Sequence, residues 1–221
     1  MTAYRVGDVP SHSDVFEVPA EILTTNFTSA TGVLFAPDGS TVLLTGSTMV
    51  LGTASEEDAY GNIATVPVVT VAWGTVSPFA AAGLYELALT LNGAGTVQQS
   101  LPYFPVVVEA EDGWLTIDSI RRLWRDAPTD DEDVFELLQV SKGAVEAFAP
   151  VLVPDPVSGR TLVPANYRKA QRMQARNTWN AAKVDPSNGS LGEDTFVIRP
   201  VPLDWQVKQV LRPKPALPWV G

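Results

Sequence analysis

Two alanine-proline pairs divide residues 113–150 into two predicted helices. The residue before a proline is pushed out of helical backbone space, so a helix should end at Ala127-Pro128 and another at Ala149-Pro150. The first helix should begin after Thr116, a good N-cap residue, and carries one apolar side formed by Ile117, Ile120 and Trp124. The second opens with Thr129-Asp130-Asp131-Glu132, which has the spacing of a capping box. Its apolar stripe at helical spacing consists of Val134, Leu137, Leu138, Ser141, Val145 and Phe148.

Residues 1–112 show a β pattern, because turn signals alternate there with short runs rich in Val, Leu and Thr. The sequence Pro37-Asp38-Gly39-Ser40 between two apolar runs predicts a hairpin, and Asn92-Gly93 predicts another turn. Residues 63–73 form the best candidate for a central strand, although Pro67 suggests an edge position or a bulge. About seven short strands at this spacing predict an antiparallel β-sandwich of immunoglobulin-like size. The Cys…Trp…Cys pattern of true immunoglobulin domains is absent, so only the architecture is expected.

A third helix is predicted from Pro164 to about Lys183, after a linker rich in proline and glycine. It carries a basic stripe: Arg168, Arg172 and Arg176 are spaced four apart and therefore share one face, and Lys169 flanks them. Its apolar face is thin, so the helix is expected to pack against neighbouring subunits as well as its own domain. The stripe could contact the phosphate backbone of DNA or acidic residues of an adjacent protomer, or it could be an ordinary solvated face.

The C-terminal residues 185–221 combine a flexible turn, a short strand at residues 196–199 and a short helix at residues 203–211, for which an extended arm is the alternative. Much apolar surface near a terminus is typical of an interaction site, although packing on its own domain would also account for it. The expected partner-docking residues are Phe196, Ile198, Trp205, Val207, Val210, Leu211, Arg212 and Trp219. The predicted fold is therefore α+β: a β-sandwich domain at 1–112, a small helical domain at 113–184 and an extended C-terminal docking arm at 185–221.

Composition excludes several classes of chemistry. The chain has no cysteine and one histidine, His12, so it offers no His- or Cys-based metal site and no nucleophile–histidine arrangement. No catalytic residue, metal or cofactor is expected, and an enzyme is the least favoured class. The N-terminus does not read as a signal peptide and no run is long enough to span a membrane, so synthesis in the cytoplasm is expected.

The charge is divided unevenly, with one basic and 12 acidic residues in 1–112 against 14 basic and 13 acidic in 113–221. Two regions with different neighbours would explain this, and so would a β domain kept soluble by its charge. The acidic loop at Glu56, Glu57 and Asp58 lacks the spacing of a calcium loop and favours a solvated loop. Trp73 and Tyr85 could form a sugar-stacking platform, but Trp73 is better explained as a core residue.

Four motifs carry a family resemblance: GWLTIDSIRRLWRDAPTDDE, AVEAFAP, NYRKAQRMQARNTWNA and the closing PLDWQVKQVLRPK. They are spread over residues 113–214, and this region resembles the head-to-tail connector (adaptor) proteins of long-tailed phages that infect actinobacteria. The N-terminal β domain departs from the small all-helical connectors of this class.

The resemblance implies a structural virion protein, assembled in the host cytoplasm and located in the neck between head and tail. It implies a ring, commonly of twelve copies, that lies below the portal protein, extends the DNA channel and receives the next neck or tail component. The basic stripe adds genomic DNA, bound non-specifically, as a further candidate partner. The β domain is interpreted as an outward elaboration that could touch the capsid or decorate the neck, a placement that the resemblance does not support. From the residues alone, a different class stays open: a β-sandwich module that binds carbohydrate or a cell surface, joined to a helical oligomerisation domain.

Overall fold

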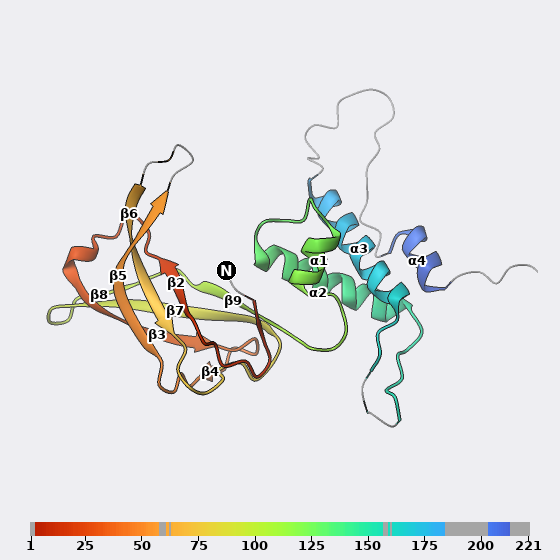
Figure 1. The fold of residues 1–221 in the computed structure, drawn as a ribbon, viewed down its shortest axis with the longest axis horizontal. Helices are drawn as coiled ribbons and strands as arrows, with labels where there is room; N and C mark the ends of the chain where they lie inside the picture. The colour runs from red at the N-terminus through yellow and green to blue at the C-terminus, as the bar shows by residue number, and fades with distance from the viewer. Residues whose placement is uncertain are drawn as a thin grey trace, which may run out of the picture. The chain divides into compact units, whose positions relative to one another are not determined.

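The computed structural model describes residues 3–57, 61, 63–156, 159, 161–183 and 203–212. The chain is α+β, with a sheet-rich N-terminal region followed by helices (Figure 1). It divides into two compact units, Met1–Ala110 and Glu111–Gly221, so the division falls two residues before the predicted boundary. Each unit has its own apolar core.

The β unit is a sandwich of two sheets. The larger sheet has the order β1-β9-β7-β3-β4, with β8 pairing the far end of β7, and the smaller has the order β2-β6-β5. All pairs are antiparallel except β1 with β9, which is parallel and was not expected. In the described residues, the strands of the larger sheet are β1 (Tyr4–Arg5), β3 (Phe27–Phe35), β4 (Thr41–Val42), β7 (Gly83–Gly93), β8 (Gln98–Ser100) and β9 (Phe104–Glu109). Those of the smaller sheet are β2 (Ser13–Glu17), β5 (Thr48–Glu57) and β6 (Ile63–Ala72), and a 3₁₀ turn, η1 (Thr24–Asn26), precedes β3.

Alternating side chains from both sheets fill the core of the sandwich. Leu87, Leu89 and Leu91 of β7 are buried on the inner face, as their spacing predicts, and pack with residues of β6 such as Val69 and Val71. The predicted hairpin at residues 37–40 is confirmed as the β3–β4 turn. There the Asp38 carboxylate accepts a hydrogen bond from the Ser40 N–H at 2.9 Å.

The prediction for Pro67 was wrong in part. β6 is the central strand of its sheet, and its register with β5 runs without a bulge from Thr48 to Glu57. The Pro67 carbonyl accepts a hydrogen bond from the Val18 N–H at 2.9 Å, just beyond the last β2–β6 pair. The N–H that proline lacks would point to the same side as this carbonyl, so the ladder with β5 loses nothing.

The helical unit consists of α1 (Ile117–Leu123), α2 (Asp131–Phe148), α3 (Ala165–Lys183) and α4 (Trp205–Leu211), and α3 contacts both α2 and α4 (Figure 1). Thr116 caps α1 as predicted, and Ser119 completes the capping box. The N-cap of α2 is Asp130 and not the predicted Thr129, because the Asp130 carboxylate accepts the Glu132 N–H at 2.8 Å.

The short helix predicted at residues 203–211 is confirmed, and its alternative, an extended arm, is wrong for this described part of the C-terminal segment. Residues 205–211 form α4, and Leu203, Val207 and Leu211 are buried in the same core as Trp114 and Tyr167. The Asn166 side-chain amide also donates to the Val210 carbonyl at 3.3 Å. This segment therefore belongs to the helical unit, because its apolar side chains complete that unit's core. The rest of the predicted arm, including Phe196, Ile198 and Trp219, lies outside the described residues.

Candidate functional site

The residues of the RRLWRDAPTDDE motif mainly build the corner between α1 and α2. The Arg121 guanidinium bonds Asp131 Oδ1 from Nη2 at 2.5 Å and from Nε at 3.2 Å. Its other contacts are to the main-chain carbonyls of Pro128 at 2.7 Å and Thr129 at 2.9 Å. The planar guanidinium of Arg121 thus holds the turn and the first residue of α2 together. This role cannot be seen from spacing alone, because the adjacent Arg121 and Arg122 look equivalent in the sequence.

Two buried side chains of α3, Gln171 and Tyr167, form polar contacts that hold the helix in the unit despite its thin apolar face. The Gln171 amide is fully buried; its Oε1 accepts the Leu115 N–H at 3.0 Å and its Nε2 donates to the Leu138 carbonyl at 3.1 Å. The Tyr167 hydroxyl donates to the Pro150 carbonyl at 2.6 Å. The helix is therefore joined to α2 and to the segment before α1 by buried hydrogen bonds, which hydrophobic periodicity does not reveal.

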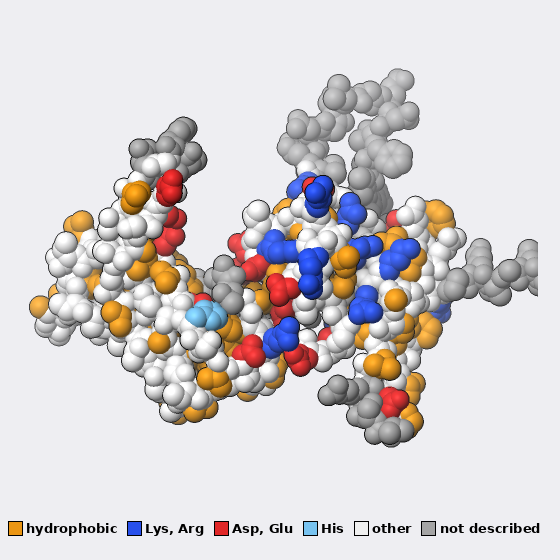
Figure 2. Space-filling model, in the orientation of Figure 1, with side chains coloured by type: hydrophobic (Ala, Val, Ile, Leu, Met, Phe, Trp, Pro, Cys, Tyr) orange, Lys and Arg blue, Asp and Glu red, His pale blue; other side chains and the backbone are white. Residues whose placement is uncertain are grey.

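The basic stripe lies on the part of α3 that these contacts leave exposed. Arg168, Lys169 and Arg176 are exposed and Arg172 is half-buried, while the buried face of the helix is formed by other positions. Within the described part of the chain, none of the four forms an ion pair. Figure 2 shows Lys and Arg side chains gathered over α1 and α3 on one face of this unit.

Arg176 has a second contact, since its guanidinium lies 6.0 Å from the centre of the Trp124 ring. The stripe can therefore attract an external anion through Arg168 and Lys169 without breaking an internal contact of the described residues.

The docking residues expected in the C-terminal segment include both buried and exposed side chains. Val207 and Leu211 are 0% and 4% exposed, so they are core residues and not a docking surface. Val210 is half-buried, whereas the Trp205 side chain is 62% exposed. Arg212 is exposed, and its guanidinium lies 4.9 Å from the centre of the Phe148 ring. Of the expected residues in α4, Trp205 is the one with a large apolar surface available to a partner.

The aromatic residues considered for a sugar platform are not accessible. Trp73 and Tyr85 are each 1% exposed and belong to the core of the sandwich. Tyr85 uses its hydroxyl internally, where it donates to the Ala81 carbonyl at 3.0 Å. Glu56 and Glu57 are exposed on the end of β5, and Asp58 lies outside the described residues.

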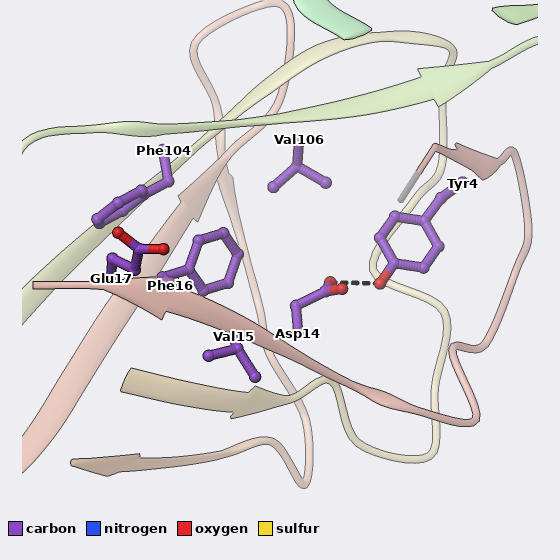
Figure 3. A pocket seen from close by; sticks show the side chains of 7 residues that line it. All are labelled: Tyr4, Asp14, Val15, Phe16, Glu17, Phe104 and Val106. Carbon is purple, nitrogen blue, oxygen red and sulfur yellow. Dashed lines mark hydrogen bonds between the residues drawn. The ribbon is translucent and has the colours of Figure 1, made fainter. Parts of the chain in front are cut away.

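A second candidate site, which the sequence did not indicate, lies at the open side of the sandwich. It is a groove of about 260 Å³ between β2 and the β1–β9 edge, shown in Figure 3. Asp14 is its centre, because its Oδ2 accepts hydrogen bonds from the Tyr4 hydroxyl and, at 2.7 Å, from the Trp73 indole N–H. The groove is lined by Tyr4, Asp14, Val15, Phe16, Glu17, Phe104 and Val106.

The contacts around Asp14 determine the protonation state of Tyr4. Burial, together with the hydrogen bond to the Asp14 carboxylate and its negative charge, raises the pKa of Tyr4 far above its ordinary value. Tyr4 therefore stays a neutral donor. His12, to which the sequence assigned no role, stacks on the Tyr4 ring at 5.9 Å, and its Nε2 lies 3.8 Å from Asp14 Oδ1.

Among the described residues, no group of three or more acidic or histidine side chains could hold a metal ion, and no helix is long and apolar enough to cross a bilayer. Comparison of the chain with protein-family models, with curated proteins and with solved structures finds no match.

Proposed function

We propose that this chain is a structural, non-enzymatic head-to-tail connector of a tailed phage, forming a ring below the portal and joining the head to the neck. The motifs of residues 113–214 support this proposal through their resemblance to that class. The observation that carries it furthest is the basic stripe on α3. Arg168 and Lys169 present charge that no described residue neutralises, on a helix otherwise committed to its own core.

An uncompensated cationic row on a small unit is suited to an anionic neighbour. In a connector this neighbour is either DNA in the channel or an acidic surface of the adjacent protomer. The helical unit itself offers such a surface, because exposed acidic side chains gather around the start of α2, including Asp126, Asp130 and Asp133. Trp205, exposed on α4, supplies apolar area for a contact with the portal or with a neighbouring copy.

The first test is the mass of the full chain in solution, alone and mixed with a candidate portal ring. We expect a small species alone and a discrete ring of many copies on the portal. A chain that stays monomeric with every portal ring tried would overturn the connector proposal. Replacement of Trp205 by Ala should weaken the complex without unfolding the chain.

Matched charge variants test the stripe. Arg168→Gln with Lys169→Gln lowers the net charge by two on α3, and Gln139→Glu with Gly143→Glu lowers it by two on the exposed side of α2. Only the first pair should weaken ring formation or retention of duplex DNA. If the stripe faces DNA, losing two contacts should reduce the slope of log affinity against log salt by about 2. If it faces a protomer, DNA retention should be unchanged while the ring dissociates. Equal effects of both pairs would refute a specific role.

A further inference from the structure

The groove at the open side of the sandwich lies between two free strand edges. β2 ends the smaller sheet, since it pairs with β6 alone. On the opposite side, β1 pairs only with Val108 and Glu109, so the earlier residues of β9 have no neighbouring strand there among the described residues. Strand edges carry main-chain donors and acceptors at regular spacing, which an added strand can use.

The direction of the β2 main chain can be worked out from one hydrogen bond. The Val18 N–H points to β6, where it meets the Pro67 carbonyl at 2.9 Å. Main-chain groups alternate in direction along a strand, so those of Phe16 and Asp14 also face β6, and those of Ser13, Val15 and Glu17 face away from it. No described main-chain group pairs with these outward-facing groups.

The side chains in the groove select for positive charge. Asp14 and Glu17 contribute carboxylates, and the Phe16 and Phe104 rings, 5.0 Å apart, form an apolar wall. Figure 3 shows these residues with the Asp14 carboxylate directed towards Tyr4. Both hydrogen bonds to Asp14 arrive at Oδ2, while the His12 ring lies 3.8 Å from Oδ1, beyond hydrogen-bond distance. Asp14 Oδ1 can therefore accept a hydrogen bond from a ligand.

We propose that this groove binds an extended segment of another polypeptide, which pairs with β2 as an added strand and places an arginine or lysine side chain against Asp14 and Glu17. Residues 1–112 contain 12 acidic residues and one basic residue, a balance that repels anionic ligands and attracts basic ones. The three outward-facing residues of β2 alternate along the strand, so only an extended main chain matches them. The basic residues of the helical unit that the structure describes lie on helices or within two residues of a helix end, so a different protein is the better source of an extended basic segment.

Three blocked six-residue peptides of alternating valine and threonine serve as probes, with arginine, citrulline or glutamate at one central position. Binding to the full-length protein is measured by fluorescence anisotropy. The site of binding is identified from the ¹H–¹⁵N NMR signal of the Trp73 indole N–H, which donates to Asp14. We expect the arginine peptide to bind and to shift this signal. The citrulline peptide keeps the shape without the charge and should bind about tenfold more weakly, and the glutamate peptide should not bind.

Two variants test the two halves of the proposal. Val15→Pro removes an outward N–H but none of the bonds to β6, and it should abolish binding. Glu17→Gln should weaken binding by about threefold, the range of an exposed ion pair. If the proline variant fails to fold, the Glu17→Gln variant still tests whether the groove binds the basic peptide. Glu86→Gln, an exposed carboxylate that does not line this groove, is the matched control and should bind like the wild type.

Equal binding of the arginine and citrulline peptides would overturn the charge assignment, and unchanged binding by Val15→Pro would overturn strand addition. Binding without a shift of the Trp73 signal would place the peptide elsewhere. Self-association of the full chain that Glu17→Gln abolishes would overturn the choice of another protein and identify a second copy as the occupant. These outcomes are distinct from failure of the connector proposal, which is tested with the portal ring.

Discussion

Replacing Arg121 should destabilise the helical unit, whereas replacing its neighbour Arg122 should not. The Arg121 guanidinium holds the α1–α2 corner through the Asp131 carboxylate and two main-chain carbonyls, those of Pro128 and Thr129. Arg122 is exposed and forms no ion pair with any residue that the structure describes. The two residues are adjacent and identical in type, so each controls for the other.

The magnitude follows from the contacts. The Arg121 side chain is 34% exposed and that of Asp131 15%, so solvent screening reduces the ion pair to about 1 kcal/mol. Each bond to a carbonyl contributes about 1 kcal/mol more. Arg121→Ala should therefore lower the free energy of unfolding by about 2–3 kcal/mol, while Arg122→Ala should stay within about 0.5 kcal/mol.

Urea unfolding followed by helical circular dichroism measures both variants, since the helices contribute most of that signal. The midpoint should fall for Arg121→Ala with an unchanged slope, and a fall in the melting temperature of roughly 10–15 °C should accompany it. Arg121→Lys keeps the charge but loses the planar fork, so most of the loss should remain. Equal stability of Arg121→Ala and Arg122→Ala would refute the assignment of the corner to this side chain.

Three further predictions concern single positions. Because the pKa of Tyr4 is raised in the folded chain, the unfolded chain releases the Tyr4 proton first as pH rises. Above about pH 10, the free energy of unfolding of the wild type should therefore fall by about 1.4 kcal/mol per pH unit more than that of Tyr4→Phe. Urea titration at several pH values measures this difference. Gly74→Ala should cost at least about 2 kcal/mol in thermal unfolding, because φ is +93° and a Cβ would strike the main-chain oxygen of Thr45, in the connection between β4 and β5. At Gly52 an added Cβ meets nothing within 4 Å, so Gly52→Ala should be nearly neutral. Val207→Ala should destabilise the chain by about 2 kcal/mol, and Trp205→Ala should leave its melting temperature nearly unchanged.

Much of the fold could be predicted because local rules determine it. The prolines at 128 and 150 delimit α2, Thr116 caps α1, and the alternation of Leu87, Leu89 and Leu91 fixes which face of β7 is buried. These features depend on neighbours a few residues away. The predicted N-cap of α2 was wrong by one residue because the capping-box spacing pointed to Thr129, whereas Asp130, the stronger N-cap residue type, accepts the Glu132 N–H.

The docking role wrongly expected for Val207 and Leu211, and the groove that the sequence did not indicate, have a different cause, because both depend on contacts between distant segments. An apolar stripe such as Val207 and Leu211 has the same pattern whether it packs on its own unit or on a partner. Asp14 meets Tyr4 and Trp73 only after β1, β2 and β6 have been brought together. A lone aspartate in a polar N-terminal segment gives no such signal, so tertiary structure alone identifies it.

The structure also changes which residues of the family-like motifs can carry function. Side chains such as Arg121, Gln171 and Tyr167 are already engaged in the corner, in the contact between α2 and α3, and with the Pro150 carbonyl. Their presence in a motif is therefore explained by the fold, and a resemblance built on them favours a shared helical unit more strongly than a shared partner. For motif residues that make no internal contact, binding to a partner is the remaining explanation of their presence. On α3 these include Arg168 and Lys169, so charge variants at these two positions discriminate between fold and function more directly than substitutions at any other motif residue.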